Sequence, residues 1–113
     1  MPNQEFCERS AHEITTTQEL LMSVLKSQEL YGLAIAKAIS EATDGEHSIP
    51  VGSLYPILRR LEKKGLVKST WGDATPEKRG GARRRYYSLT GLGSKTLSDV
   101  QQLRSAVLNW QPV

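Results

Sequence analysis

The fold is decided by one stretch, Ser53-Leu54-Tyr55-Pro56-Ile57-Leu58-Arg59-Arg60-Leu61-Glu62-Lys63-Lys64-Gly65-Leu66. Read as a helix, it places Leu54, Leu58 and Leu61 on one side, at the spacing of a core-facing stripe. The other side carries four cations and two hydroxyl side chains, with one glutamate among them. Gly65 followed by Leu66 is typical of a Schellman helix end. We therefore predict a recognition helix, whose exposed face suits phosphates and base edges in a DNA major groove.

The charge of the chain is concentrated around this helix. The net charge of all 113 residues is only +3, but residues 59–85 contain ten cations and three anions, a net +7. The other residues together therefore carry −4. Such asymmetry favours a polyanionic partner for the basic segment. The alternative is a solvated surface that only keeps the protein in solution.

Composition and length place the chain in a broad class. With 38% apolar and 24% charged residues, a chain of 113 residues is expected to form one globular domain. No apolar run approaches the roughly 20 residues that span a bilayer. Residues 1–12 lack the apolar segment of a secretory signal. We expect a cytoplasmic protein without a membrane partner.

Cysteine and histidine offer no chemistry of their own. Cys7 is the single cysteine, so an intrachain disulfide is excluded, and we expect an inert thiol in preference to a redox switch. His12 and His47 lack the spacing of a metal site. Because the sequence also has no nucleophile–base pair and no phosphate-cradling glycine loop, it predicts neither an enzyme nor a cofactor.

Two further helices are expected before the recognition helix. Thr16 and Glu19 match a capping box, which predicts a first helix from there to about Lys26. A second helix is predicted to begin at Tyr31-Gly32 and to end at Gly45. The start of the third helix stays open: Ser53 caps it, with Pro56 in the first turn, or it begins earlier and loses one hydrogen bond at Pro56.

A β-hairpin is predicted after Gly65. Residues 66–71 and 84–89 are rich in β-branched and aromatic residues, and residues 72–82 have the glycines and proline of a loop. Of Tyr86 and Tyr87, one should face inward and the other outward, and Trp71 is expected in the core or as support for the hairpin. Three helices followed by a basic hairpin form a winged helix-turn-helix. The predicted fold class is mainly α with a small β-hairpin, plus a C-terminal helix.

The last helix is predicted to begin after Thr90 and to run toward Trp110. Apolar residues recur along it with almost coiled-coil spacing, at Leu97, Val100, Leu103, Val107 and Trp110. We predict that they form a homodimer interface, the alternative being a helix that folds back on the first helix of its own chain. Trp110 with Val107 is a candidate site for a flat effector, although plain interface packing is the commoner role. The expected division is a loose arm at 1–14, the winged helix at 15–89 and the dimerisation helix at 90–113.

Several motifs together resemble the PadR family of transcriptional regulators. They are Tyr31-Gly32 with Ile35-Ala36-Lys37-Ala38-Ile39, Gly52-Ser53-Leu54-Tyr55-Pro56, Leu58-Arg59-Arg60-Leu61-Glu62, Gly65-Leu66, and Arg84-Arg85-Tyr86-Tyr87-Ser88-Leu89-Thr90 with Gly93. The resemblance covers about residues 17–97. The single short C-terminal helix is similar to that of the smaller subgroup of the family. It implies a winged-helix dimer that represses transcription and is often released by a small hydrophobic or aromatic effector. The chain departs from it in an acidic N-terminal arm and in Asp73 and Glu77 near the tip of the hairpin.

Specific residues are assigned to the DNA interface. The candidates are Ser53, Tyr55, Arg59, Arg60, Lys63, Lys78, Arg79, Arg83 and Arg84. Arg59 and Lys63, one turn apart, are the foremost candidates for base or backbone contacts, and the hairpin cations would anchor phosphates. Tyr55 has an equally good alternative, packing against the second helix.

The sequence therefore predicts a homodimeric, sequence-specific DNA-binding repressor that recognises a pseudo-palindromic operator. The main alternative is a winged-helix protein–protein interaction module that uses its basic face on an acidic partner. A third reading is a ligand-binding dimer whose DNA contact is vestigial.

Overall fold

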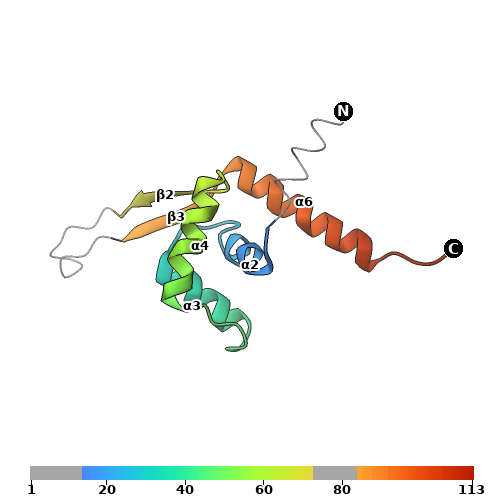
Figure 1. Cartoon of the computed structure of the whole chain (residues 1–113), viewed down its shortest axis with the longest axis horizontal. Coiled ribbons are helices and arrows are strands. Elements are labelled where there is room, and N and C mark those ends of the chain that lie inside the picture. The colour runs from blue at the N-terminus through green and yellow to red at the C-terminus, as the bar shows by residue number, and fades with distance from the viewer. Residues whose placement is uncertain (1–13, 73–83) are drawn as a thin grey trace.

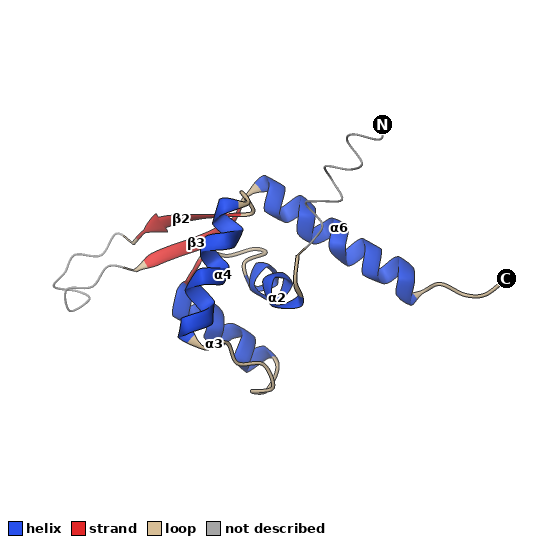
Figure 2. Cartoon of the chain, viewed as in Figure 1, coloured by secondary structure: helices blue, strands red, loops and turns tan. Residues whose placement is uncertain are grey.

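The computed structural model describes residues 14–72 and 84–113. It is a mainly helical winged helix with one small sheet, as predicted (Figures 1 and 2). In chain order, the elements are α2 (Thr16–Val24), β1 (Leu30–Tyr31), α3 (Gly32–Ala42), α4 (Val51–Lys63), β2 (Val67–Trp71), β3 (Arg85–Leu89) and α6 (Gly91–Leu108). The predicted turn residues 73–82 lie outside the described residues, as do Cys7 and His12.

The core lies between α2, α3 and α4 and is closed by the sheet and the first part of α6. Leu54, Leu58 and Leu61 are fully buried, which confirms the predicted stripe. They meet buried side chains from each neighbouring element: Leu21, Met22, Leu25, Ile35, Ile39, Leu66, Val67, Tyr87 and Leu97. Burial of this stripe fixes the rotation of α4, so its opposite side must face solvent.

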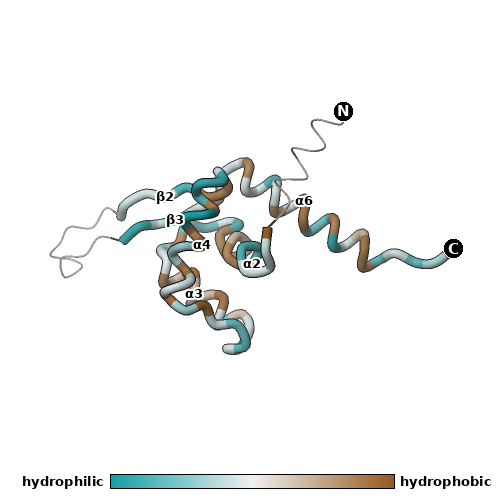
Figure 3. Tube along the Cα trace, viewed as in Figure 1, coloured by the Kyte–Doolittle hydropathy of each residue, from teal (hydrophilic) through white to brown (hydrophobic). Residues whose placement is uncertain are grey.

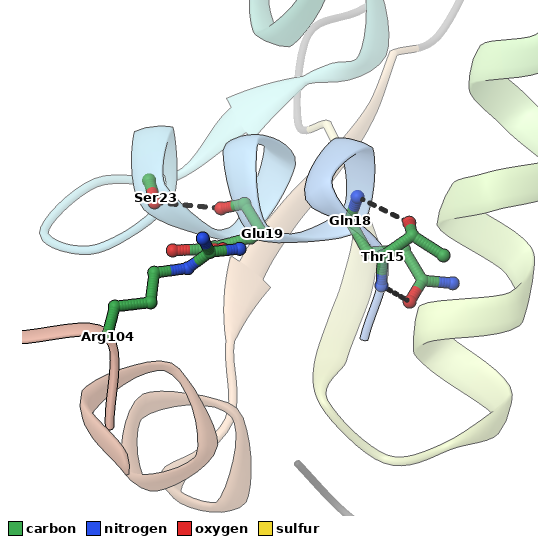
Figure 4. Close-up of polar contacts among 5 residues, drawn as sticks. All are labelled: Thr15, Gln18, Glu19, Ser23 and Arg104. Carbon is green, nitrogen blue, oxygen red and sulfur yellow. Dashed lines mark hydrogen bonds and ion pairs between the residues drawn. The ribbon is translucent and has the colours of Figure 1, made fainter. Parts of the chain in front are cut away.

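The start of α2 differs from the prediction by one residue. The N-cap is Thr15 and its partner is Gln18: the Gln18 N–H donates to Thr15 Oγ1, and the Thr15 N–H donates to Gln18 Oε1 (Figure 4). The prediction of Thr16 with Glu19 was wrong because both threonines can cap and both Gln and Glu can close the box. Glu19 is thereby left for another contact. The helix also ends at Val24, before Lys26.

The sheet has three strands, in the order β1-β3-β2, and both pairings are antiparallel. The predicted hairpin is confirmed, with Ser69 opposite Tyr87 and Trp71 opposite Arg85. Tyr87 is buried and Tyr86 half-buried, as the alternation predicted. The extra strand is β1, where the prediction started a helix: Tyr31 pairs with Tyr86, and α3 begins only at Gly32. A strand of two residues has no sequence period that could reveal it.

The ends of α4 follow from proline and glycine. Pro50 is the N-cap, so the helix begins before Ser53 and tolerates Pro56 in its interior. Pro56 has no N–H for the carbonyl of Gly52, four residues before it. At the other end Gly65 has φ +79°, and the Leu66 N–H donates to the Leu61 carbonyl at 3.0 Å. With the bond from Gly65 to Glu62, also 3.0 Å, this is the predicted Schellman end.

Thr90 joins the end of α4 to the start of α6. Its Oγ1 accepts the Gly93 N–H at 2.9 Å, as predicted for the cap, and donates to the Gly65 carbonyl at 2.6 Å. A Cβ on Gly93 would collide with the Leu66 carbonyl oxygen, so the two segments can approach this closely only at a glycine. From this anchored start, α6 leads away from the rest of the fold, on the side opposite the hairpin (Figure 1).

Candidate nucleic-acid interface

The exposed face of α4 carries the residues predicted to meet DNA. Ser53, Arg59, Arg60 and Lys63 are all exposed, opposite the buried leucine stripe. Among residues 14–72 and 84–113, no carboxylate forms an ion pair with Arg59, Arg60 or Lys63. Because these three side chains have no ion pair with a described carboxylate to break, they can bind phosphates or base edges by giving up only bound water.

A groove of about 690 Å³ separates α4 from the hairpin. Four aromatic residues and three arginines, with one glutamate, make up most of its lining: Tyr31, Gly32, Leu33, Tyr55, Arg59, Glu62, Trp71, Arg84, Arg85 and Tyr87. The groove therefore brings the recognition helix, the start of α3 and the hairpin to one surface. Two site residues predicted from distant parts of the chain, Arg59 and Arg84, line it together.

Tyr55 points toward α3 and is half-buried. A Cβ on Gly32 would lie 2.6 Å from the Tyr55 hydroxyl oxygen, so the tyrosine occupies the space that Gly32 leaves free. The ring packs against the core, and the same side chain lines the groove. The packing alternative therefore describes this tyrosine in the unbound chain.

Arg84 and Arg85 lie next to each other and both line the groove, but they contact different residues. The Arg84 guanidinium carbon lies 4.3 Å from the centre of the Tyr31 ring, which meets Tyr86 edge-on at 5.7 Å. Arg84 stays exposed. Lys78, Arg79 and Arg83, the other cations predicted for the hairpin, lie outside the described residues.

Arg85 faces α4, where it joins Glu62 and Ser69. Ser69 Oγ donates to Glu62 Oε2 at 2.7 Å, and Arg85 Nε donates to Ser69 Oγ at 2.8 Å. Arg85 Nη2 lies 3.5 Å from the same carboxylate oxygen. None of these three residues was predicted to have a role in the site. The alternation of the strand gave a signal, since Arg85 must share the face of the buried Tyr87.

Tyr87 and Trp71 are the aromatic residues of β3 and β2 on this face. Burial raises the pKa of the Tyr87 phenol, and the nearby Arg85 charge opposes the rise only in part. Tyr87 is thus a neutral hydroxyl at physiological pH. Trp71 is 56% exposed with Arg85 5.6 Å from its ring centre, so of the two predicted places the core is excluded and the position on the hairpin agrees with the structure. Its place at the end of β2 lies beyond the part of the sheet that the helices cover.

The predicted dimer seam on α6 divides in two. Leu97 and Val100 are buried, 2% and 7% exposed, so the prediction that they face a second copy was wrong. This half of α6 packs on α2 and β3, as the fold-back alternative expected. An apolar stripe reveals that a helix is covered but not by which partner.

The outer half of α6 is not covered by any other part of residues 14–72 and 84–113. Leu103, Val107 and Trp110 are 59%, 70% and 70% exposed, and hydrophobic segments recur to the end of the helix (Figure 3). Shallow apolar hollows flank Val107, one lined with Leu103 and Leu108 and the other with Trp110. Trp110 itself follows the helix, which ends at Leu108, so it is not part of a continuous helical seam.

An ion pair marks the boundary between the two halves. Arg104 Nη2 and Nε lie 2.7 and 3.0 Å from Glu19 Oε1, and Figure 4 shows the arginine reaching from α6 to α2. Glu19 is available because Gln18 closes the capping box. Sequence analysis missed this pair, which joins residues 85 positions apart.

The described residues contain no group of three or more histidines, cysteines, aspartates or glutamates placed to hold a metal. No helix among them is both long and apolar enough to cross a membrane.

Comparison with known proteins agrees with this geometry. The model of the "Transcriptional regulator PadR-like family" matches residues 21–99. "Uncharacterized protein X" of Lysinibacillus sphaericus is 31% identical over 81 residues, which cover 72% of this chain and 71% of that protein. The crystal structure of a PadR family transcription regulator from Clostridium difficile R20291 is similar at 32% identity and TM-score 0.66, covering 80% of this chain and 88% of its own. The structure of RosR from H. salinarum is similar at 28% sequence identity and a TM-score of 0.70, and the match covers 88% of this chain and 82% of that protein.

Proposed function

The chain belongs to the PadR-like family of transcriptional regulators, and from this premise we propose a homodimeric repressor that binds a pseudo-palindromic operator and is released by a small aromatic effector. The family is one of DNA-binding regulators and not of enzymes. The observation that carries the proposal is the exposed set of Arg59, Arg60 and Lys63 on α4, which form no ion pair with a carboxylate of residues 14–72 and 84–113, beside a groove that contains further arginines.

The recognition helix in this proposal is α4. Arg59 and Lys63 reach base edges or phosphates in the major groove, while Arg60 and Ser53 contact the backbone beside them. Tyr55 offers its hydroxyl to a phosphate at the mouth of the groove. The hairpin contributes Arg84, and with it Lys78, Arg79 and Arg83, as phosphate anchors that supply affinity without sequence information.

The dimer contact is the outer half of α6. Leu103, Val107 and Trp110 are exposed apolar side chains on α6 and just beyond its end, which favours an interaction surface, and a second copy related by a two-fold axis covers them. Two α4 helices then enter successive major grooves, roughly 34–36 Å apart.

The effector site of the proposal is the apolar surface at Val107 and Trp110. A flat aromatic molecule stacks on the indole at the two-fold axis. To release the operator it must bind more tightly to a dimer in which the two recognition helices have the wrong separation. Quenching of Trp110 fluorescence tests this part of the proposal separately from DNA binding, using the W71F variant because Trp71 is the other tryptophan.

Selection of bound duplexes from a random DNA pool tests the whole proposal. The selected duplex is titrated against its scrambled version by fluorescence anisotropy at two salt concentrations. A palindromic sequence preferred by about 10³-fold or more is the expected result. Binding with a steep salt dependence and no preferred sequence would leave only a basic patch. The alternative function, a protein–protein module for an acidic partner, would then replace this one.

A further inference from the structure

We propose that Glu62, Ser69 and Arg85 form a clip that fixes the hairpin against the recognition helix, and that these three are positioning residues for DNA binding. The inference rests on the proposed function, because it concerns how the same interface is held in shape. It assigns Glu62 a role opposite to the one its charge suggests. Arg85 is not a phosphate anchor in this account, although its neighbour Arg84 is.

The clip connects two elements that meet DNA. Glu62 lies in the last turns of α4, Ser69 in the middle of β2, and Arg85 at the start of β3. Ser69 and Arg85 share the sheet face that carries the buried Tyr87. The clip therefore lies just outside the core, at the level where the hairpin leaves the helices.

The hydrogen bonds within the clip have one consistent direction. A carboxylate can only accept and a guanidinium can only donate, so the Ser69 hydroxyl must donate to Glu62 and accept from Arg85. The three distances, 2.7, 2.8 and 3.5 Å, allow this arrangement. Loss of the hydroxyl removes both bonds at once, whereas threonine keeps a hydroxyl and suits a strand.

The charges explain why these residues are poor DNA contacts themselves. Arg85 is 44% exposed and Glu62 32% exposed, and each is the other's counter-ion. Arg85 already directs Nε at Ser69 and Nη2 at Glu62, so its charge is partly neutralised and only its remaining N–H groups could meet a phosphate. Arg84 stacks on Tyr31 instead, where its charge is not matched by a carboxylate among the described residues.

The consequence is a fixed angle between recognition helix and hairpin. DNA contacts by both elements at once require that each reach its own groove or strand without distortion of the other. A hairpin held only by its base would order on binding, and that ordering would lower the affinity. The clip orders it in advance, which raises affinity for the correct duplex more than for DNA in general.

Glu62→Gln gives the sharpest test, because repulsion of DNA by Glu62 and a positioning role for Glu62 predict opposite changes in operator affinity. If Glu62 only repels the DNA, its neutralisation tightens binding to every duplex. A positioning role predicts that affinity for the selected operator falls by roughly tenfold, while affinity for the scramble stays equal or rises. Glu41→Gln is the matched control: it removes the same charge from an exposed pair with Lys37 on α3. It should leave the ratio of operator to scramble affinity unchanged.

Arg85→Ala and Arg84→Ala separate a positioning residue from a phosphate anchor. Loss of an anchor lowers the slope of log affinity against log salt by about 0.9. We expect that decrease for Arg84→Ala, and for Arg85→Ala a weaker affinity with the wild-type slope. Ser69→Ala should resemble Arg85→Ala, and Ser69→Thr should restore wild-type binding.

A measurement without DNA keeps the inference falsifiable if affinity changes have other causes. Hydrogen–deuterium exchange of the full chain should show faster exchange of the β2 and β3 amides near Ser69 in Ser69→Ala, with α2 and α3 unchanged. Tighter operator binding by Glu62→Gln, or a lower salt slope for Arg85→Ala, would overturn the clip. Absence of operator preference in the wild type would instead overturn the proposed function.

Discussion

The cationic face of α4 and the outer half of α6 are both exposed to solvent. They differ in the free energy that exposure costs. Arg59 and Lys63 are exposed charged side chains. Water solvates them in the free protein, so this face is stable without a bound partner. Leu103 and Val107 are exposed as well, but each Å² of apolar surface left in water forgoes about 25 cal/mol. The contrast separates a charged surface that is stable in water from an apolar surface that gains free energy when it is buried.

The inner half of α6 sharpens the contrast. Leu97 and Val100 belong to the same helix and the same apolar repeat, and the chain covers them itself. The cover ends near Arg104, where the ion pair with Glu19 makes the last described polar contact between α6 and α2. Beyond Arg104, Val107 and the end of the helix are not covered by any residue that the structure describes.

The largest effect is expected from Leu103→Asp with Val107→Asp. Both side chains point away from the core, so the variant should fold, but two buried charges per copy are incompatible with an apolar contact. We expect a monomer by sedimentation equilibrium and operator binding no stronger than to a single half-site. Gln102→Asp, an exposed polar position on the same helix, should remain dimeric. A double variant that is still a dimer would remove α6 from the interface.

The next effect concerns the α4 face. Arg59→Ala and Lys63→Ala should each weaken operator binding by about 1–3 kcal/mol where the side chain contacts a base, or lower the salt slope by about 1 where it contacts a phosphate. Dimerisation should not change. Lys37→Ala removes an exposed cation from α3 and serves as control in the same anisotropy titration. Wild-type affinity in both α4 variants would contradict the assignment of this face.

Much of the fold could be predicted because the signals were local. The leucine stripe of α4, its Schellman end at Gly65 and the alternation of Tyr86 and Tyr87 depend on spacing within a few residues. The one-residue shift of the α2 cap came from two equivalent patterns side by side. The strand at Tyr31 was missed because pairing, and not its own sequence, makes those two residues a strand.

The site was less predictable because its geometry depends on residues that are far apart in sequence. The α4 cations could be named, since a buried stripe determines what lies opposite it. The bonds of Glu62 with Ser69 and Arg85, and of Glu19 with Arg104, join different elements, and no spacing rule pairs them. Leu97 and Leu103 show the same limit, because one periodic stripe is buried at the first residue and exposed at the second.

A smaller effect is expected at Thr90, which anchors the start of α6 to the end of α4. Thr90→Ala loses the cap to Gly93 and the bond to the Gly65 carbonyl, so the free energy of unfolding should fall by about 1 kcal/mol. Urea denaturation followed by circular dichroism measures it. Thr90→Ser retains the hydroxyl and should retain most of the stability. Equal losses in the two variants would show that the methyl group, and not the hydroxyl, stabilises this junction.

The smallest effect is expected at the boundary of the two halves of α6. Arg104 is largely exposed although Glu19 is not, so Arg104→Met should cost no more than about 1 kcal/mol of stability, and less at high salt. A double-mutant cycle with Glu19→Gln isolates the pair from the lost packing of the arginine stem. A coupling of several kcal/mol would mean that the pair, and not the apolar contacts of Leu97 and Val100, holds α6 to the fold.

We propose that two copies, joined by α6, place their α4 helices in successive major grooves of one operator. The most direct test of this arrangement is the affinity of the protein for the selected duplex and for a version with about five base pairs, half a helical turn, inserted between the half-sites. We expect the insertion to lower affinity to that of an isolated half-site, because the second major groove then faces away from the second α4 helix. Equal affinity for the two duplexes would contradict it.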